Sequence, residues 1–261
     1  FQNTKYKILN TKYIALLSSF FLATSFWHVN FSRIGFRAIL LTFILVFGFY
    51  FLFKGFREKR IPHFIISGIF FGLGFYSYIS FRMIVLLLPL VLFSLQKKYL
   101  FFIFYFLFFI FIVALPLGLY FIQNPQDFIG RAAPISVFAA ENPLKEFGKS
   151  LILHLGMFNF FGDQNWRHNF AGSPMLFWPI GILFLFGFVL SIKYTKWLLA
   201  WFFVMLLPGI LTYEGIPHAL RVIGVIPVVY IFAGLGGWKV YQLLSQNTKN
   251  KKLLISAVLF F

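Results

Sequence analysis

The sequence predicts an all-α protein, a polytopic transmembrane helical bundle, and three observations support this prediction. Of the 261 residues, 61% are hydrophobic and 11% are charged, and the mean hydropathy is +0.87. A soluble domain of this length cannot bury so much apolar surface in one core. The apolar residues also come in repeated runs of roughly 20, the length that crosses about 30 Å of hydrocarbon as a helix.

Short charged or Pro/Gly-bearing stretches separate these runs, and the separators set the boundaries of the expected helices. A further apolar run begins at residue 253 and continues to the last residue, Phe261. The chain begins with Phe1 and stops inside this run, so we expect a fragment of a longer protein, with residues 1–261 forming a single membrane domain. The eight complete runs cover residues 12–30, 37–54, 62–78, 82–96, 99–122, 175–192, 196–212 and 219–238.

One connection between the runs, residues 123–174, is much longer than the others. It carries Pro125, Pro134 and Pro143 and an amphipathic stretch at residues 144–161. Loops of this length without a function are uncommon. We therefore expect an external loop with one or two helices that lie at the membrane surface.

The basic residues indicate orientation. If the N-terminal segment is cytoplasmic, the cytoplasmic loops hold fifteen of the 23 Lys and Arg residues and only one of the six acids, Glu58. This asymmetry follows the positive-inside rule, so the net charge of +17 reports topology and predicts no nucleic-acid partner. The expected location is the cell (inner) membrane, with the active face extracytoplasmic. No cysteine is present, which excludes thiol catalysis and disulfides within the chain.

The external face is rich in arginine, which binds phosphate better than lysine because its guanidinium donates two parallel hydrogen bonds. Arg33 and Arg37 are four residues apart and share a helix face, although both could simply snorkel to lipid headgroups. A charge at the depth of Arg82 is costly unless it lines a wet cavity. Arg221 follows Pro217, which favours a helix start. The arginines of this face that could bind a lipid phosphate are Arg33, Arg37, Arg82 and Arg221.

Polar clusters beside these arginines supply candidate groups for a sugar or an acceptor. The stretch Asp163–Asn169 combines an acid, amides, an indole, a guanidinium and an imidazole, although a well hydrogen-bonded loop would look the same. If an acceptor hydroxyl reacts on this face, Asp163 and Glu214 are the external acids best suited to accept its proton. The predicted sugar- or acceptor-binding residues are Tyr76, Asn165, Arg167, His168, Asn169 and His218.

A metal site is a weaker interpretation of the same residues. His168 with His218 or Asp163 could bind an ion, but their spacing in the sequence matches no compact ligand pattern. The sequence therefore predicts no cofactor, and a divalent metal is left open.

Four motifs on this face carry a resemblance to a known family. They are Trp27-His-Val-Asn-Phe-Ser-Arg33, Tyr76 to Arg82, Asn165-Trp-Arg-His-Asn169 with Gly172 and Pro174, and Pro217-His-Ala-Leu-Arg221. With them the chain resembles the GT-C glycosyltransferase superfamily, in the branch of protein O-mannosyltransferases and lipid A aminoarabinose transferases. The resemblance implies transfer of a sugar from a polyprenyl-phosphate carrier to a lipid, glycan or protein acceptor. It also implies a catalytic acid in a first external loop, which we expect to precede this segment.

Two other functions stay open. A lipid-linked glycan ligase or polymerase would also be polytopic with a large external loop, and would use diphosphate carriers. A transporter or flippase would carry out no chemistry, but such proteins often place polar residues near the midplane, whereas these polar residues gather at one face.

Overall fold

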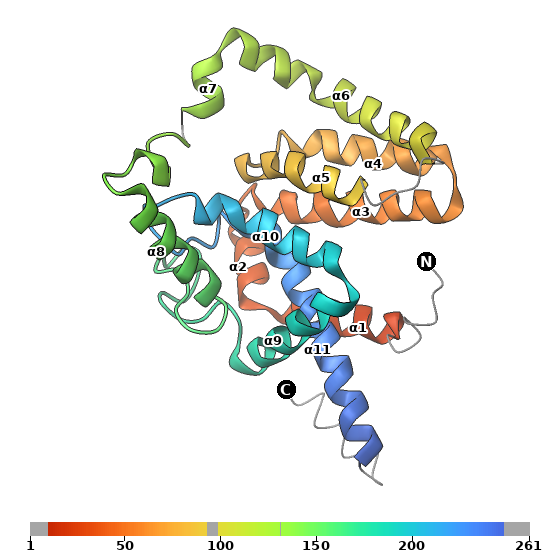
Figure 1. Cartoon of the computed structure of the whole chain (residues 1–261), viewed down its shortest axis with the longest axis vertical. Coiled ribbons are helices and arrows are strands. Elements are labelled where there is room, and N and C mark those ends of the chain that lie inside the picture. The colour runs from red at the N-terminus through yellow and green to blue at the C-terminus, as the bar shows by residue number, and fades with distance from the viewer. Residues whose placement is uncertain (1–9, 93–98, 131, 248–261) are drawn as a thin grey trace.

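The computed structural model describes residues 10–92, 99–130 and 132–247, and the described chain is all-α (Figure 1). An isolated bridge between Ser136 and Thr212 is the extent of β structure among these residues. The α-helices are α1 (Thr11–Thr24), α2 (Phe26–Ile34), α3 (Ile39–Glu58), α4 (Ile61–Gly74), α5 (Ile84–Leu92), α6 (Leu100–Gln123), α7 (Pro125–Ile129), α8 (Pro143–Gly156), α9 (Trp178–Tyr194), α10 (Lys196–Ile210) and α11 (Ile226–Asn247). The 3₁₀ helices are η2 (Ile79–Met83), η4 (Val137–Ala139) and η5 (Ile223–Val225).

The predicted fold class is confirmed, and each of the eight expected runs overlaps an apolar helix or helix pair, although residues 93–96 of the run 82–96 lie outside the described residues. The main difference lies in the first run, which is bent by 55° between α1 and α2. Ser25 causes the break, because its side chain accepts a hydrogen bond from the His28 backbone N–H at 3.1 Å and begins a new helix. The expected run from residue 253 lies outside the described residues.

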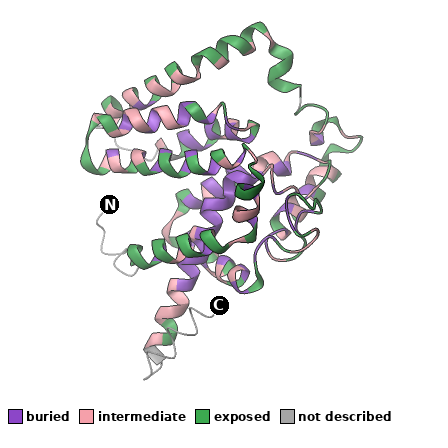
Figure 2. Cartoon of the chain, turned by 180° about the vertical axis from the view of Figure 1, so that it is seen from behind, coloured by how far each residue is buried: buried purple, intermediate pink, exposed green. Residues whose placement is uncertain are grey.

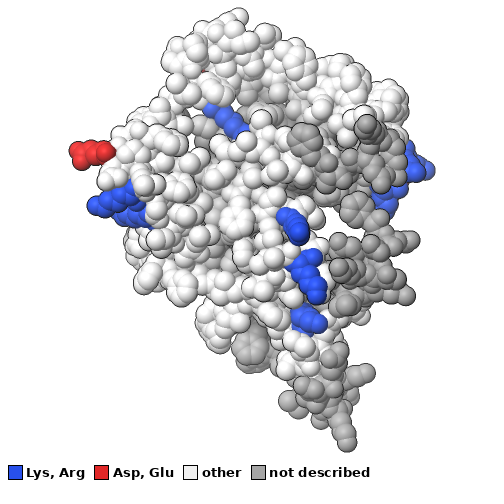
Figure 3. Space-filling model, viewed as in Figure 1, with Lys and Arg blue, Asp and Glu red and all other residues white. Residues whose placement is uncertain are grey.

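Three of the described helices are long and apolar enough to cross a membrane, namely α3, α6 and the continuous helix Ile223–Ser245. The bent α1–α2 pair would make a fourth, and four shorter apolar helices accompany them. The face of the molecule in Figure 3 is predominantly uncharged. These features define a multi-pass membrane protein.

The bundle is built around α11, whose apolar window is 78% buried, whereas that of α6 is 6% buried. Figure 2 shows this contrast between the purple centre and the green and pink outer helix. A Cβ atom at Gly187 would lie 1.7 Å from the Phe232 carbonyl oxygen, and one at Gly236 would lie 2.0 Å from that of Leu183. Glycine at these two positions therefore lets the backbones of α9 and α11 touch, as in many membrane helix pairs.

The long connection between α6 and α9 contains α7, η4 and α8, so it carries short helices as the sequence predicts. Helix α8 turns Ser150 and His154 into the protein, whereas Leu144 and Ile152 are exposed. The segment also places α7 close to η2, because the Arg82 side chain of η2 donates a hydrogen bond to the Phe128 carbonyl of α7. The basic stretch at residues 57–60 precedes α4 and η2 follows it, so the two lie at opposite ends of that helix.

Candidate functional site

A cavity of about 1030 Å³ opens at the end of the bundle where η2, α7 and the loop after α10 meet. Its volume is at the upper end of the range for small-molecule sites. We call it the arginine cavity, because Arg37, Arg82 and Arg221 come from three distant parts of the chain and all line it. The other polar lining residues are Tyr76, Ser77, Tyr78, Ser80, Gln126, Asp127, Ser136, Thr212 and His218.

Arg82 is held between two aromatic rings. Its guanidinium lies 4.2 Å from the ring centre of Phe128 and 5.0 Å from that of Phe121, and it also donates to the Phe128 carbonyl. Cation–π contacts of this kind stabilise a cation without neutralising its charge. Arg82 therefore keeps its positive charge at the cavity wall.

Arg221 is fixed at both ends. Its Nη1 donates to Thr212 Oγ1 at 2.8 Å and to the Glu214 carbonyl at 2.6 Å. Its own carbonyl accepts a hydrogen bond from Ser80 Oγ at 2.8 Å. Burial lowers the pKa of Arg221, yet a guanidinium remains protonated at neutral pH.

The ion pairs among the described residues do not include the arginines of the cavity. The pairs involve Arg57, His63, Lys149, His168 and His218 as the basic partners. Arg37, Arg82 and Arg221 thus have no carboxylate within 4.0 Å in the part of the chain that the structure describes. The cavity consequently presents positive charge that a bound anion could neutralise.

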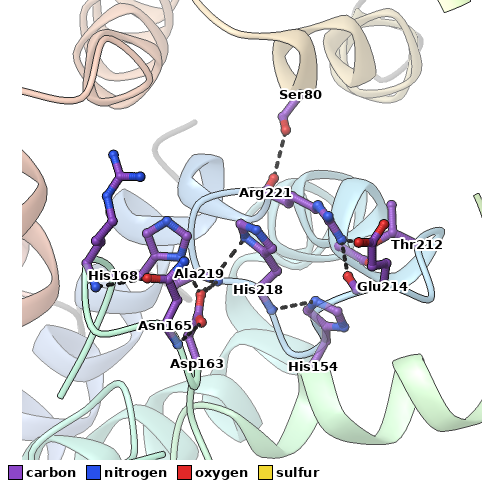
Figure 4. A network of polar contacts seen from close by, with 12 residues as sticks. Ser80, His154, Asp163, Asn165, His168, Thr212, Glu214, His218, Ala219 and Arg221 are labelled. Carbon is purple, nitrogen blue, oxygen red and sulfur yellow. Dashed lines mark hydrogen bonds and ion pairs between the residues drawn. The ribbon is translucent and has the colours of Figure 1, made fainter. Parts of the chain in front are cut away.

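Beside this cavity lies a group of three polar side chains, which we call the Asp163 cluster (Figure 4). It consists of the buried Asp163 and His168 and the partly buried His218. Asp163 Oδ2 accepts hydrogen bonds from His168 Nδ1 at 2.8 Å and from the Ala219 backbone N–H at 2.7 Å. Its Oδ1 accepts from the Asn165 N–H at 2.8 Å. A single carboxylate therefore joins the loop that contains residues 162–174 to the loop that contains residues 211–222.

His154 supports the same junction from α8. Its Nε2 accepts a hydrogen bond from the His218 backbone N–H at 3.2 Å, and its Nδ1 lies 2.8 Å from the Ser150 carbonyl oxygen. This pattern requires a neutral ring with the proton on Nδ1. Gly209 makes room for it, since a Cβ there would lie 2.5 Å from His154 Nε2.

The environment shifts the pKa values of these groups in different directions. Burial lowers the pKa of His154 to about 4, and burial together with the nearby Arg221 cation also lowers the pKa of His218. Burial by itself would raise the pKa of Asp163, but the hydrogen bonds from His168, Asn165 and Ala219 outweigh it, so the pKa is lowered. At neutral pH Asp163 is therefore an anion and His154 and His218 are neutral.

The structure brings some of the predicted phosphate and sugar ligands together and separates others. Arg37, Arg82, Arg221, Tyr76 and His218 all line the arginine cavity. Five further phosphate and sugar candidates are not among its lining residues, namely Arg33, Asn165, Arg167, His168 and Asn169.

Those outlying residues have structural contacts of their own. Arg33 is exposed. Arg167 lies 5.4 Å from the ring centre of Phe36, and its carbonyl accepts from Asn30 Nδ2 at 3.0 Å. Asn165 Oδ1 accepts from the Arg167 N–H at 2.9 Å, and Asn169 Nδ2 donates to the Ser173 carbonyl at 2.5 Å. Asn169 also lines a second, smaller cavity of about 510 Å³ beside the α1–α2 bend.

Neither predicted catalytic carboxylate lines the arginine cavity. Asp163 is 2% exposed and is occupied by hydrogen bonds, and Glu214 is exposed and contributes its backbone carbonyl to Arg221. Their role as proton acceptors stays a prediction. The carboxylate that does line the cavity is Asp127, which accepts a hydrogen bond from Tyr120 Oη at 2.5 Å.

Sequence reasoning missed Asp127 and His154 as site residues. For His154 a signal existed, because Ser150 and His154 are four residues apart on one face of an amphipathic helix. For Asp127 the sequence offers no signal, since its place at the cavity depends on how α7 folds back from α6.

The fold and the site together define a multi-pass helical membrane protein with a cationic cavity at one end of its bundle. No protein-family model, curated protein or solved structure matches the chain. The resemblance to the GT-C superfamily therefore stays a prediction from the four motifs.

Proposed function

We propose that the chain is the membrane domain of a glycosyltransferase that takes a sugar from a polyprenyl-phosphate carrier and transfers it to an acceptor on the extracytoplasmic face of the cell membrane. One observation carries the proposal. Three arginines without carboxylate partners among the described residues line a single cavity of about 1030 Å³.

The reaction requires groups that stabilise a developing negative charge, and the cavity arginines are such groups. An acceptor hydroxyl forms a bond to the anomeric carbon while the bond from that carbon to the carrier phosphate breaks, and the lipid phosphate leaves with the bonding electrons. Arg37, Arg82 and Arg221 stabilise the negative charge that develops on the leaving phosphate. Their positive charge is most effective where water is scarce.

The other cavity residues suit a sugar and a proton acceptor. Hydroxyl groups from Tyr76, Ser77, Ser80 and Ser136 line the wall and are typical hydrogen-bonding partners of sugar hydroxyls. We assign the acceptor proton to Asp127, because a general base must reach the reacting hydroxyl and Asp127 is a carboxylate in the lining. An extracytoplasmic position of the arginine cavity is supported by its location at the end of α4 opposite the basic stretch at residues 57–60, because the positive-inside rule favours the cytoplasmic side for that stretch.

The test uses membranes that contain the full-length protein and undecaprenyl-phosphate mannose with a radiolabelled sugar. The expected result is transfer of label to the lipid, glycan or protein fraction, with a loss on the order of 100-fold or more in an Arg82→Ala, Arg221→Ala double variant. Arg57→Ala with Arg60→Ala is the matched control, because it removes two arginines from the opposite end of α4 and should leave transfer unchanged.

Three outcomes would overturn the proposal. Full activity of the cavity double variant would show that the arginines do not act on the donor. Preferred use of an undecaprenyl-diphosphate oligosaccharide would indicate a ligase or polymerase. Movement of the intact carrier across the membrane without cleavage would indicate a flippase.

A further inference from the structure

The Asp163 cluster has the composition and the geometry of a metal site. One ligand atom from each of Asp163, His168 and His218 lies within 4.8 Å of the other two. The carboxylate oxygen is 2.8 Å from His168 Nδ1 and 3.9 Å from His218 Nδ1. Two imidazole nitrogens and one carboxylate oxygen are a ligand set that first-row transition metals, zinc in particular, favour in proteins.

One atom of this cluster is not satisfied within the described protein. His218 Nδ1 is buried and has no hydrogen-bond partner, and its distance of 3.9 Å from the Asp163 oxygen is too long for a hydrogen bond. Such an orphaned buried nitrogen is destabilising and calls for a specific explanation. An ion bound between it and Asp163 would satisfy it.

We propose that Asp163, His168 and His218 bind a divalent transition-metal ion of the zinc class between the 162–174 loop and the 211–222 loop. Tetrahedral zinc with bonds of about 2.0 to 2.1 Å separates its ligand atoms by about 3.3 Å. The two measured separations of 2.8 and 3.9 Å lie on either side of this value. Side-chain shifts of about half an ångström would bring both Asp163 separations to about 3.3 Å.

The surroundings hold the three ligands in place, as the outer shell of a metal site does. Asp163 is oriented by the N–H groups of Asn165 and Ala219. The His168 ring packs against the rings of Phe31 and Phe36, with centres 5.5 and 5.7 Å apart. When His168 Nδ1 binds the ion, the neutral ring carries its proton on Nε2 instead.

Three protein ligands leave one tetrahedral position for water or for an oxygen of a bound anion. His218 also lines the arginine cavity, so the ion would lie next to that cavity and add positive charge to it. Metal binding at this site can be measured without sugar transfer, because all three proposed ligands come from the protein.

The experiment is a metal-binding measurement on the full-length protein, purified in detergent and stripped with a chelator. Titration with Zn²⁺ should show one tight site per chain, and Co²⁺ should give the intense visible absorption of a tetrahedral site. His168→Ala and His218→Ala should each weaken Zn²⁺ binding on the order of 100-fold or more. His28→Gln, which changes a histidine outside the cluster, should bind as the wild type does.

Several results would overturn the proposal. Wild-type protein that binds Zn²⁺ no more tightly than the His168→Ala, His218→Ala double variant has no site here, and the cluster is then only a hydrogen-bonded junction. A Co²⁺ spectrum typical of octahedral water ligation would have the same meaning. Because the Co²⁺ spectrum is recorded on the wild type, it decides the question even if the variants do not fold.

Discussion

The arginine cavity and the Asp163 cluster are adjacent and share His218, yet they differ in how their charged side chains are stabilised. In the cluster, an anionic carboxylate is buried and is held by three donors from two loops. In the cavity, Arg82 is held by aromatic rings and a carbonyl, and Arg221 by a hydroxyl and a carbonyl, none of which cancels their charge. The comparison indicates that the anion of the cluster is stabilised by hydrogen bonds within the protein, whereas the cations of the cavity are available to an anionic ligand.

The largest effect on stability should come from Asp163→Ala. Removing the carboxylate leaves the His168, Asn165 and Ala219 donors without their acceptor, so we expect the free energy of unfolding to fall by about 3 kcal/mol or more. Thermal unfolding of the detergent-solubilised protein measures this. Asp163→Asn should lose less, and Glu141→Ala, at an exposed acid, should change little. Unchanged stability in Asp163→Ala would contradict the conclusion that the buried carboxylate of the cluster stabilises the fold.

Low pH should destabilise the same junction between the two loops, because His154 becomes protonated. Its pKa of about 4 in the folded protein is below the value of about 6.5 expected when unfolded, so the unfolded state binds more protons between these values. Stability is therefore complete above pH of about 6.5 and falls toward pH 4, by about 2 kcal/mol between pH 8 and pH 5. Unfolding measured across this range should show a smaller slope in His154→Gln. An identical slope in that variant would contradict the assignment.

A smaller effect is expected where the two regions meet, in Ser80→Ala. The variant loses the hydrogen bond to the Arg221 carbonyl, which should lower the free energy of unfolding by about 1 kcal/mol. The matched control is Ser32→Ala, whose hydroxyl bonds to the carbonyl of His28 in its own helix and should matter less. Equal effects of the two serines would show that Ser80 has no special part in holding the cavity wall.

Arg37→Ala should have the smallest effect on stability but a clear effect on the binding of an anionic ligand. Arg37 is exposed, so unfolding should change by less than about 0.5 kcal/mol. Binding of undecaprenyl phosphate, measured by native mass spectrometry, should weaken about 10-fold, the usual loss for one charge-assisted hydrogen bond. Arg57→Ala is the control. Unchanged binding in Arg37→Ala would argue that the cavity charge does not face an anion.

Most of the fold could be predicted from the sequence, because hydropathy alone separates apolar helices from their connections. The bend at Ser25 could not, since one serine N-cap interrupts a run that is apolar throughout. The four polar motifs did indicate which residues gather at one end. Which of them share a cavity could not be predicted, because Asp163 and Ala219, or Ser80 and Arg221, meet only through packing between segments far apart in the chain.

The two-ended anchoring of Arg221 has a consequence for binding affinity. A free arginine side chain loses about 2 kcal/mol of rotamer entropy when a ligand immobilises it. Thr212 Oγ1 and the Glu214 carbonyl already restrain the head group of Arg221, and Ser80 restrains its backbone. Most of that conformational freedom is therefore lost during folding, and an arriving anion meets a preorganised cation.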